Sequence, residues 1–357
     1  MKSAGTILKF ALLAVAVPAL AQQGNIQHAK LETRSAASGL QQQVDAVVRQ
    51  GSAAWIAWQV PSIHDNTDMC CYNSRGDHSQ CGCALENNGG VTVNSSDQHS
   101  TAPVKLENAD FEVFVRAESG HIQKVRTMGV NCPVDAQNMP VYWLSDVKPA
   151  DSVRLLTTVA EQSGGDGEKR PADGAVLAIA MTKDASADAA LDQLIDAKQP
   201  EWLRKKVAFW LGMERGASGL NKLLALMKSD QNDSFRKELV FPISQSKAPG
   251  AEDELMRIAK EDSSTGVREQ AIFWLAQRAG AKVAAMIKDT VDNDPNTEVK
   301  KRAVFALSQM PTDQGIPLLI QVAKNNANSQ VRKQAIFWLG QSHDPRALDY
   351  IESVLKQ

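Results

Sequence analysis

Apolar residues recur in the second half of the chain with a period of 32 positions. Each copy opens with an apolar residue followed by a cation, at 203–204, 235–236, 267–268, 299–300 and 331–332. An apolar pattern of helical spacing follows, most clearly Ala-Ile-Phe-Trp-Leu at 271–275 and again at 335–339. A unit this short cannot bury its own apolar face, so successive units must stack. The pattern predicts an α-solenoid.

The solenoid is expected to span residues 171–357. A weaker copy begins near Pro171, because one further step of 32 back from Val207 and Leu211 reaches Ala175 and Ile179. The second helix of each later unit keeps an aliphatic residue, at Leu223, Leu255, Ile287, Leu319 and Ile351. We therefore expect six helical hairpins, the first degenerate, as terminal repeats usually are.

A different pattern precedes this array and predicts a small α+β domain over residues 22–162. Residues 22–34 are polar and expected to be mobile, whereas 36–49 carry apolar positions at helical spacing. Alternating or β-branched runs predict strands at 55–60, 111–116, 121–130 and 141–144. The two middle strands flank a turn at 118–120 and should form a hairpin.

The two parts are joined through a helix and a linker. Asp151 and Ser152 can cap a helix that runs to about Glu161. Residues 163–170 are Gly-rich and charged, which predicts the interdomain linker.

The first 21 residues are typical of a cleaved signal peptide. Lys2 and Lys9 flank the start of an apolar run, which ends in small residues at Ala19 and Ala21. The run is too short to span a bilayer. We expect cleavage before Gln22 and a periplasmic or secreted protein with no membrane span.

Composition narrows the function. The apolar content of 43% is ample for packed cores, and the formal net charge of −2 lacks the basic excess of a nucleic-acid binder. We found no hydrolase, metalloprotease, nucleotide or dinucleotide motif. The sequence therefore gives no catalytic residue and no cofactor, and it predicts a protein that is not an enzyme.

The five cysteines all lie in the N-terminal domain. In an oxidising compartment they favour disulfides, with at least one thiol left over because the number is odd. The disulfide candidates are Cys70, Cys71, Cys81, Cys83 and Cys132. A zinc or copper(I) site remains an alternative, with Cys70, Cys71, Cys81, Cys83 and His78 as its ligands.

Cations recur at one repeat position and form what we term the basic ladder: Arg204, Arg236, Arg268, Lys300 and Arg332. Four of them are followed by a further cation, which gives the lysine row: Lys205, Lys237, Lys301 and Lys333. Cations in a first helical turn oppose the helix dipole, so helix stability does not account for them. Either they pair with the acidic residue of the preceding turn, which is Asp230, Asp262 or Asp294, or they line an interaction surface for an acidic partner.

Aromatic residues form a second ladder, the phenylalanine row: Phe209, Phe241, Phe273, Phe305 and Phe337. Trp210, Trp274 and Trp338 stand beside three of them. A stacked core is the ordinary interpretation, and the alternative is that one edge of the row faces the concave surface. Pro242 should kink its helix.

The repeats resemble a known family. Asp262 with Val267-Arg268 and Ala271, and the equivalent residues of the next two copies, are similar to HEAT repeats of the short bacterial type found in phycobilin lyases. The resemblance covers about half the chain and implies a solenoid with short loops. It does not carry lyase activity over, because the shared residues are packing residues.

Taken together, the sequence predicts an exported scaffold whose solenoid binds an envelope protein or peptide. The alternative is a metal-handling or thiol-redox protein that uses the loop containing Cys70, Cys71, Cys81 and Cys83.

Overall fold

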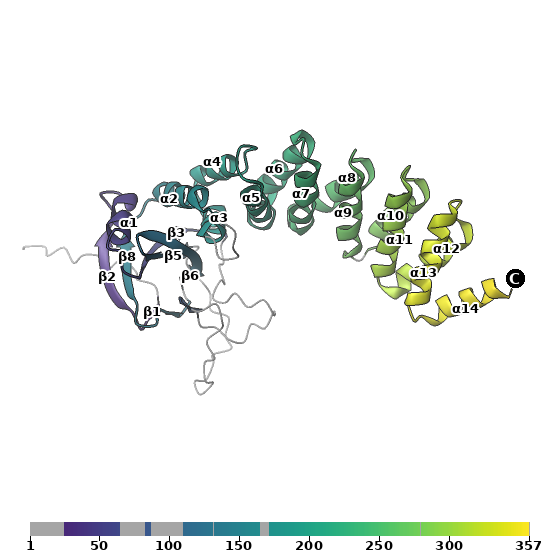
Figure 1. The fold of residues 1–357 in the computed structure, drawn as a ribbon, viewed down its shortest axis with the longest axis horizontal. Coiled ribbons are helices and arrows are strands. Elements are labelled where there is room, and N and C mark those ends of the chain that lie inside the picture. Colours follow the sequence, from purple (N-terminus) through teal and green to yellow (C-terminus); the bar gives the residue numbers. More distant parts are fainter. Residues whose placement is uncertain are drawn as a thin grey trace, which may run out of the picture.

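The structure, a computed structural model, describes residues 25–64, 83–86, 110–130, 132–164, 171–278 and 280–356. A β-sheet domain sits at one end of a long arch of helices (Figure 1). The expected signal peptide, most of the expected linker, His78 and three of the cysteines lie outside the described residues.

The N-terminal domain contains two sheets. A five-stranded sheet has the order β2-β8-β3-β5-β6, and a small parallel sheet has the order β1-β7-β4. In the larger sheet, β3, β5 and β6 are antiparallel neighbours, whereas β8 lies parallel to β2 and β3. The strands are β1 (Ile26–Gln27), β2 (Lys30–Ser35), β3 (Ala54–Pro61), β4 (Cys83–Ala84), β5 (Asp110–Glu118), β6 (His121–Gly129), β7 (Val134–Asp135) and β8 (Pro140–Ser145).

Four predicted strands are confirmed as β3, β5, β6 and β8, and β5 and β6 form the expected hairpin. The prediction of a mobile polar segment up to residue 34 was wrong, because β1 and β2 lie there. As an edge strand, β2 has mostly exposed residues, so it lacks the apolar alternation that reveals a strand.

Helices account for most of the other residues that the structure describes. They are α1 (Leu40–Val48), α2 (Pro149–Gln162), α3 (Pro171–Met181), α4 (Ala185–Leu194), α5 (Glu201–Glu214), α6 (Gly216–Ser229), α7 (Asp233–Gln245), α8 (Ala251–Glu261), α9 (Thr265–Ala276), α10 (Ala281–Asn293), α11 (Thr297–Gln309), α12 (Thr312–Asn325), α13 (Ser329–Gln341) and α14 (Pro345–Leu355). From α3 onward they pair into six hairpins, as predicted. The expected cap of α2 was wrong: Pro149 opens that helix, so Asp151 lies in its first turn and pairs with Arg154 at 3.0 Å.

The solenoid curves because its two layers pack differently. The inner helices α5, α7, α9, α11 and α13 pack closely on one another, whereas successive outer helices barely touch. The outer helices therefore splay apart, and the inner helices line the concave edge of the arch (Figure 1). Pro242 lies inside α7, which continues through it to Gln245.

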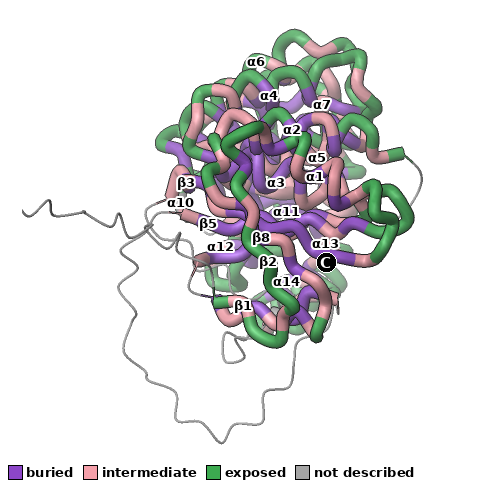
Figure 2. The backbone as a smooth tube through the Cα atoms, turned by 90° about the vertical axis from the view of Figure 1, so that its left-hand side faces the viewer, coloured by how far each residue is buried: buried purple, intermediate pink, exposed green. Residues whose placement is uncertain are grey.

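One hydrophobic core runs from the sheet into the repeats. Figure 2, which looks along the arch, shows buried segments toward the middle and exposed segments around the rim. The junction is tight, because a Cβ added to Gly174 of α3 would lie 2.0 Å from the carbonyl oxygen of Val125 in β6. His64 adds a polar contact, its Nε2 lying 2.6 Å from Glu214 of α5. The sheet and the first repeats thus support each other.

Candidate functional site

The basic ladder joins consecutive repeats. Arg204 on α5 donates from Nε to the carbonyl of Ile195, 3.0 Å away at the end of α4, and its other end pairs with Asp230. Asp230 is the C-cap of α6 and accepts a hydrogen bond of 2.8 Å from the amide of Asn232, which caps α7. A single side chain therefore connects the end of one hairpin to the turn that starts another.

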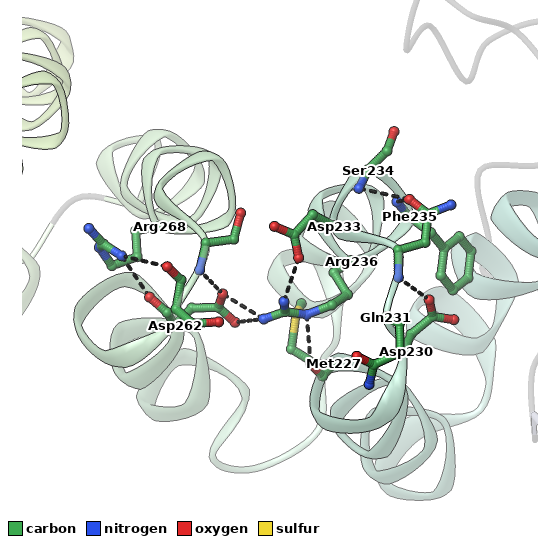
Figure 3. A network of polar contacts seen from close by, with 12 residues as sticks. Met227, Asp230, Gln231, Asp233, Ser234, Phe235, Arg236, Asp262 and Arg268 are labelled. Carbon is green, nitrogen blue, oxygen red and sulfur yellow. Dashed lines mark hydrogen bonds and ion pairs between the residues drawn. The ribbon is translucent and has the colours of Figure 1, made fainter.

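The same arrangement recurs one repeat later (Figure 3). Arg236 donates to the carbonyl of Met227 at 2.9 Å and to Oδ1 of Asp262 at 2.6 Å. Arg268 approaches both carboxylate oxygens of Asp294, at 3.1 and 3.3 Å, and the carbonyl of Asp262 at 2.7 Å. The carboxylates are those expected from the sequence, but each arginine pairs with the aspartate of the following turn, not the preceding one.

The fourth rung of the ladder has a different chemistry. Lys300 replaces arginine and donates to the carbonyl of Asp292 at 2.6 Å, and Asn326 stands where the other repeats have the paired aspartate. The side-chain amide of Asn326 donates to the carbonyl of Val291 at 3.3 Å. This carbonyl is equivalent to those that accept hydrogen bonds from Arg204 and Arg236 in their repeats. The Asn326 amide thus makes the contact that a guanidinium makes in those two repeats. In the last rung, Arg332 donates to the carbonyls of Asn326 and Ala327, at 2.7 and 3.0 Å.

The inner helices present three parallel rows. Residues four apart share one face of a helix, and Lys237, Phe241 and Gln245 on α7 follow this spacing. The same spacing on α11 and α13 adds the other members. Lys301, Phe305 and Gln309 belong to α11, and Lys333, Phe337 and Gln341 to α13.

Two inner helices depart from this lysine–phenylalanine–glutamine pattern. On α9, Glu269 precedes Phe273 and Gln277, and on α5 Met213 takes the place of glutamine. The third row, the glutamine row, therefore consists of Gln245, Gln277, Gln309 and Gln341. Sequence reasoning missed it, although its recurrence every 32 residues was available as a signal.

The phenylalanine row forms an aromatic strip in two stretches, one from Phe209 to Phe273 and one from Phe305 to Phe337. The rings of Phe209 and Phe241 stack with centroids 6.0 Å apart, and Phe241 lies 4.5 Å from Trp274. Phe305 and Phe337 each lie 5.0 Å from Trp338. Four of the five phenylalanines are half-buried, and Phe337 is 53% exposed. The row thus packs along the solenoid while one edge stays accessible, instead of forming a fully buried core.

Three tryptophans back this strip. The indole nitrogens of Trp210, Trp274 and Trp338 are buried and have no hydrogen-bond partner in the part of the chain that the structure describes. Each indole meets the phenylalanine before it edge to face, with interplanar angles of 77°, 75° and 79°. A buried indole without an acceptor costs stability. The same arrangement recurs at one position of three repeats, where ring stacking takes the place of a hydrogen bond to the indole nitrogen.

The lysine row differs from the basic ladder in its contacts. Lys205 pairs with Glu201 at 2.8 Å and with Glu238 at 3.3 Å, and the hydrogen bond that Lys205 donates to Glu201 raises the pKa of the Lys205 ammonium. Lys301 pairs with Glu298 at 2.9 Å. Lys237 and Lys333 are exposed, and no carboxylate of the described residues lies within ion-pair distance of them.

A cavity of about 510 Å³ opens between the turn after α6 and helix α8. Its walls carry both signs of charge, and Arg236 there is paired with Asp233 and Asp262 (Figure 3). Arg257 on the opposite wall pairs with Glu254 at 2.8 Å. Three cations and four carboxylates line the cavity, so neither charge is in strong excess there.

The cysteine-rich part is described only at Cys83, which opens β4, and at Cys132, which is fully buried. Among the described residues, no three histidine, cysteine or acidic side chains group as metal ligands. The segment that follows Cys83 is held by Glu86, which accepts hydrogen bonds from Trp55 and Arg116, each 2.7 Å long. Burial alone would raise the pKa of Glu86, but these contacts outweigh it and lower the pKa.

The N-terminal domain also contains an isolated carboxyl group. Glu112 in β5 is fully buried and flanked in register by Gln59 and Met128, and among the described residues neither of its oxygens has a hydrogen-bond partner. Burial raises its pKa to about 8. The sequence did not single it out, because a polar residue in a strand is ordinarily exposed.

Stacked helical hairpins with a concave inner face define the class of α-solenoid proteins. A family profile for HEAT repeats matches residues 220–308 and, overlapping them, 287–357. Residues 220–357 therefore consist of HEAT repeats, as the resemblance in the sequence indicated.

Three solved structures are similar to parts of the chain. The CpcE–CpcF complex of phycocyanin lyase from Nostoc sp. PCC7120 is 18% identical, with a TM-score of 0.32, over 42% of this chain and 98% of that one. Human deoxyhypusine hydroxylase is 15% identical, with a TM-score of 0.30, over 57% and 90%. The YibA protein of Escherichia coli is 26% identical, with a TM-score of 0.33, over 52% and 68%. No curated protein matches the chain.

Proposed function

We propose that this HEAT-repeat protein is an exported scaffold that binds an extended segment of another envelope protein along its inner face. HEAT repeats form extended concave surfaces that serve protein interactions. The observation that carries the proposal is the phenylalanine row, a half-exposed aromatic strip that crosses five inner helices. Contiguous exposed apolar surface of this kind marks interaction sites, whereas single exposed apolar residues do not.

The rows beside it suit a polypeptide. Glutamine amides both donate and accept hydrogen bonds, as a peptide backbone requires. Gln277, Gln309 and Gln341 are exposed on the side of the phenylalanine row opposite the lysine row. An extended chain on this face would therefore meet apolar, amide and cationic groups in parallel lines.

Replacing Phe337 by alanine tests this function. Phe337 is 53% exposed, so the change should leave folding intact while it weakens retention of short random-sequence peptides by about tenfold. The control is Leu348→Ala, because Leu348 is 59% exposed on α14 and lies outside the three rows. Equal peptide retention by both variants and the wild type would sink the proposal.

Export is part of the proposal and is tested separately. It is supported by the apolar N-terminal run in the sequence, and no described helix is long and apolar enough to cross a membrane. N-terminal sequencing of the protein from its native host should begin at Gln22. A first residue within the apolar run would contradict export by signal cleavage.

Disulfide cross-linking of the N-terminal domain belongs to the same proposal. It is supported by the five cysteines of this domain, of which Cys132 is fully buried. The alternative metal or thiol-redox function depends on Cys70, Cys71, Cys81 and Cys83. Thiol counting with elemental analysis separates the two, since one free thiol without metal fits the scaffold and three or more thiols with stoichiometric metal fit the alternative.

A further inference from the structure

Arg302 interrupts the aromatic strip of the inner face. Its guanidinium carbon lies over two rings of the phenylalanine row, 5.1 Å from the centroid of Phe273 and 4.9 Å from that of Phe305. The equivalent positions in the other repeats are Lys206, Glu238, Gln270 and Gln334, so this stacked guanidinium belongs to one repeat. It stands near the middle of the strip, with rings on both sides.

The contacts of Arg302 leave its hydrogen-bonding capacity unused. Ring faces attract the positive charge but accept none of the N–H groups in conventional hydrogen bonds. Among the described residues, no carboxylate lies within ion-pair distance of Arg302, whereas the neighbouring Lys301 has Glu298 and Arg268 has Asp294. A guanidinium presents five N–H donors in a plane that matches a carboxylate. Arg302 is half-buried, so these donors remain within reach of a ligand.

The ring spacing at the start of the strip fits an extended chain. Alternate side chains of an extended strand lie about 6.7 Å apart on one face, which is close to the 6.0 Å between the rings of Phe209 and Phe241. An extended segment could therefore place two alternate apolar side chains against these rings. Further along the face, another of its side chains would reach Arg302 between Phe273 and Phe305.

We propose that the inner face recognises an extended peptide segment in which one acidic side chain is seated on Arg302 and flanked on both sides by apolar side chains. This rests on the proposed function and gives it a partner chemistry. The acidic residue fixes the register, because it is the one that can pair with the guanidinium between Phe273 and Phe305. The apolar residues supply contact area on either side.

A single-stranded nucleic acid is the competing occupant, since bases also stack on aromatic rings beside cations. The charge of the inner face favours the peptide. Glu201, Glu238 and Glu298 already pair with two of its lysines, and Glu269 interrupts the lysine row. A phosphate backbone would meet these carboxylates repeatedly, whereas a segment with one acidic residue need not.

Two random-sequence peptide libraries test the proposal on the full chain. They differ at one central position, which is glutamate in one library and glutamine in the other. The wild type should retain the glutamate library about tenfold better, as one charge-assisted hydrogen-bonded pair allows. Arg302→Gln should abolish that preference while it still retains both libraries through the phenylalanine row.

Further variants keep the result decisive. Arg257→Gln, which removes a comparably exposed arginine from the outer helix α8, should keep the full preference. Arg302→Lys preserves charge without the planar donor set and should keep only part of it, which serves if Arg302→Gln does not fold. Equal retention of both libraries by the wild type would overturn this inference and leave the proposed function standing. Retention of neither library would overturn both, and displacement of bound peptide by a single-stranded oligonucleotide would favour the competing occupant.

Discussion

At the scale of single residues, the most consequential side chains are the arginines of the basic ladder. Arg268 is buried and satisfies the Asp294 carboxylate and the Asp262 carbonyl together. A buried ion pair adds little over a well-packed apolar pair, but removing one partner leaves the other charge uncompensated. The ladder therefore specifies how repeats dock more than it adds to stability.

Arg268→Ala should lower the free energy of unfolding by about 1–3 kcal/mol, because Asp294 loses its partner in a buried setting. Lys333→Ala is the control, since its exposed side chain should change stability by less than about 0.5 kcal/mol. Urea denaturation followed by circular dichroism measures both. Equal midpoints would mean that the ladder does not hold the repeats together.

Glu112 makes stability depend on pH. Its pKa is about 8 in the folded protein and near 4.5 when exposed, so between these values the unfolded chain releases a proton that the folded protein keeps. Stability should therefore fall as pH rises through this window, by on the order of 1 kcal/mol per pH unit. Glu112→Gln cannot titrate and should flatten this slope.

Unfolding in urea at about pH 5 and about pH 8 measures the effect. The difference between the wild type and Glu112→Gln isolates this carboxyl from other titrating groups. Parallel pH profiles for the two proteins would contradict a buried, neutral Glu112.

The sequence revealed residues whose role repeats but not residues whose role depends on a distant neighbour. The basic ladder was predictable because it recurs every 32 positions. Its pairing register was not, since the aspartates before and after each arginine are equivalent in the sequence. The isolation of Glu112 depends on strands that meet it only in the fold.

At the scale of elements, the close approach of α3 to β6 sets how the sheet meets the solenoid. Gly174 permits this approach, because any larger side chain would strike backbone atoms of Val125 that cannot rotate away. The first repeat can thus pack directly against the sheet because Gly174 has no side chain.

Gly174→Ala should destabilise the protein by roughly 1–3 kcal/mol, even though alanine favours helices, because its Cβ would lie 2.0 Å from the Val125 oxygen. Gly266→Ala near the start of α9 is the matched control. A Cβ there would have no neighbour closer than 4.0 Å, so that variant should be neutral or slightly more stable. Thermal unfolding that ranks the two variants the other way would refute the tight junction.

Repetition in the sequence also explains which elements could be predicted from it. The inner and outer helices were predicted because their buried faces repeat. The edge strand β2 was not, because Lys30, Glu32 and Arg34 conceal it among polar residues. The glutamine row escaped notice because a search guided by apolar periodicity passes over polar residues at any spacing.

At the scale of the whole molecule, stability should vary along the arch. Each repeat contacts its neighbours, so the array behaves as a chain of coupled units. The first repeat is anchored on the sheet, whereas α14 buries only Ala347 and Tyr350 and exposes Leu348 and Leu355.

Hydrogen exchange should therefore show least protection in α14 and rising protection toward α3, because local opening costs least where the fewest apolar contacts break. Exchange measured by mass spectrometry on the 357-residue chain resolves this gradient. Uniform protection from α3 to α14 would mean that the solenoid unfolds as one unit.

The replacement of arginine and aspartate by Lys300 and Asn326 has a mechanical consequence. Three rungs hold their turns through charged pairs, whereas the fourth does so through the uncharged amide of Asn326. Under tension along the arch, the rungs act as springs in series, and the softest takes up most of the extension. The joint at Asn326 is thus more compliant than the three charged joints before it, and a partner pulling on the inner face would bend the arch there before it bends those three.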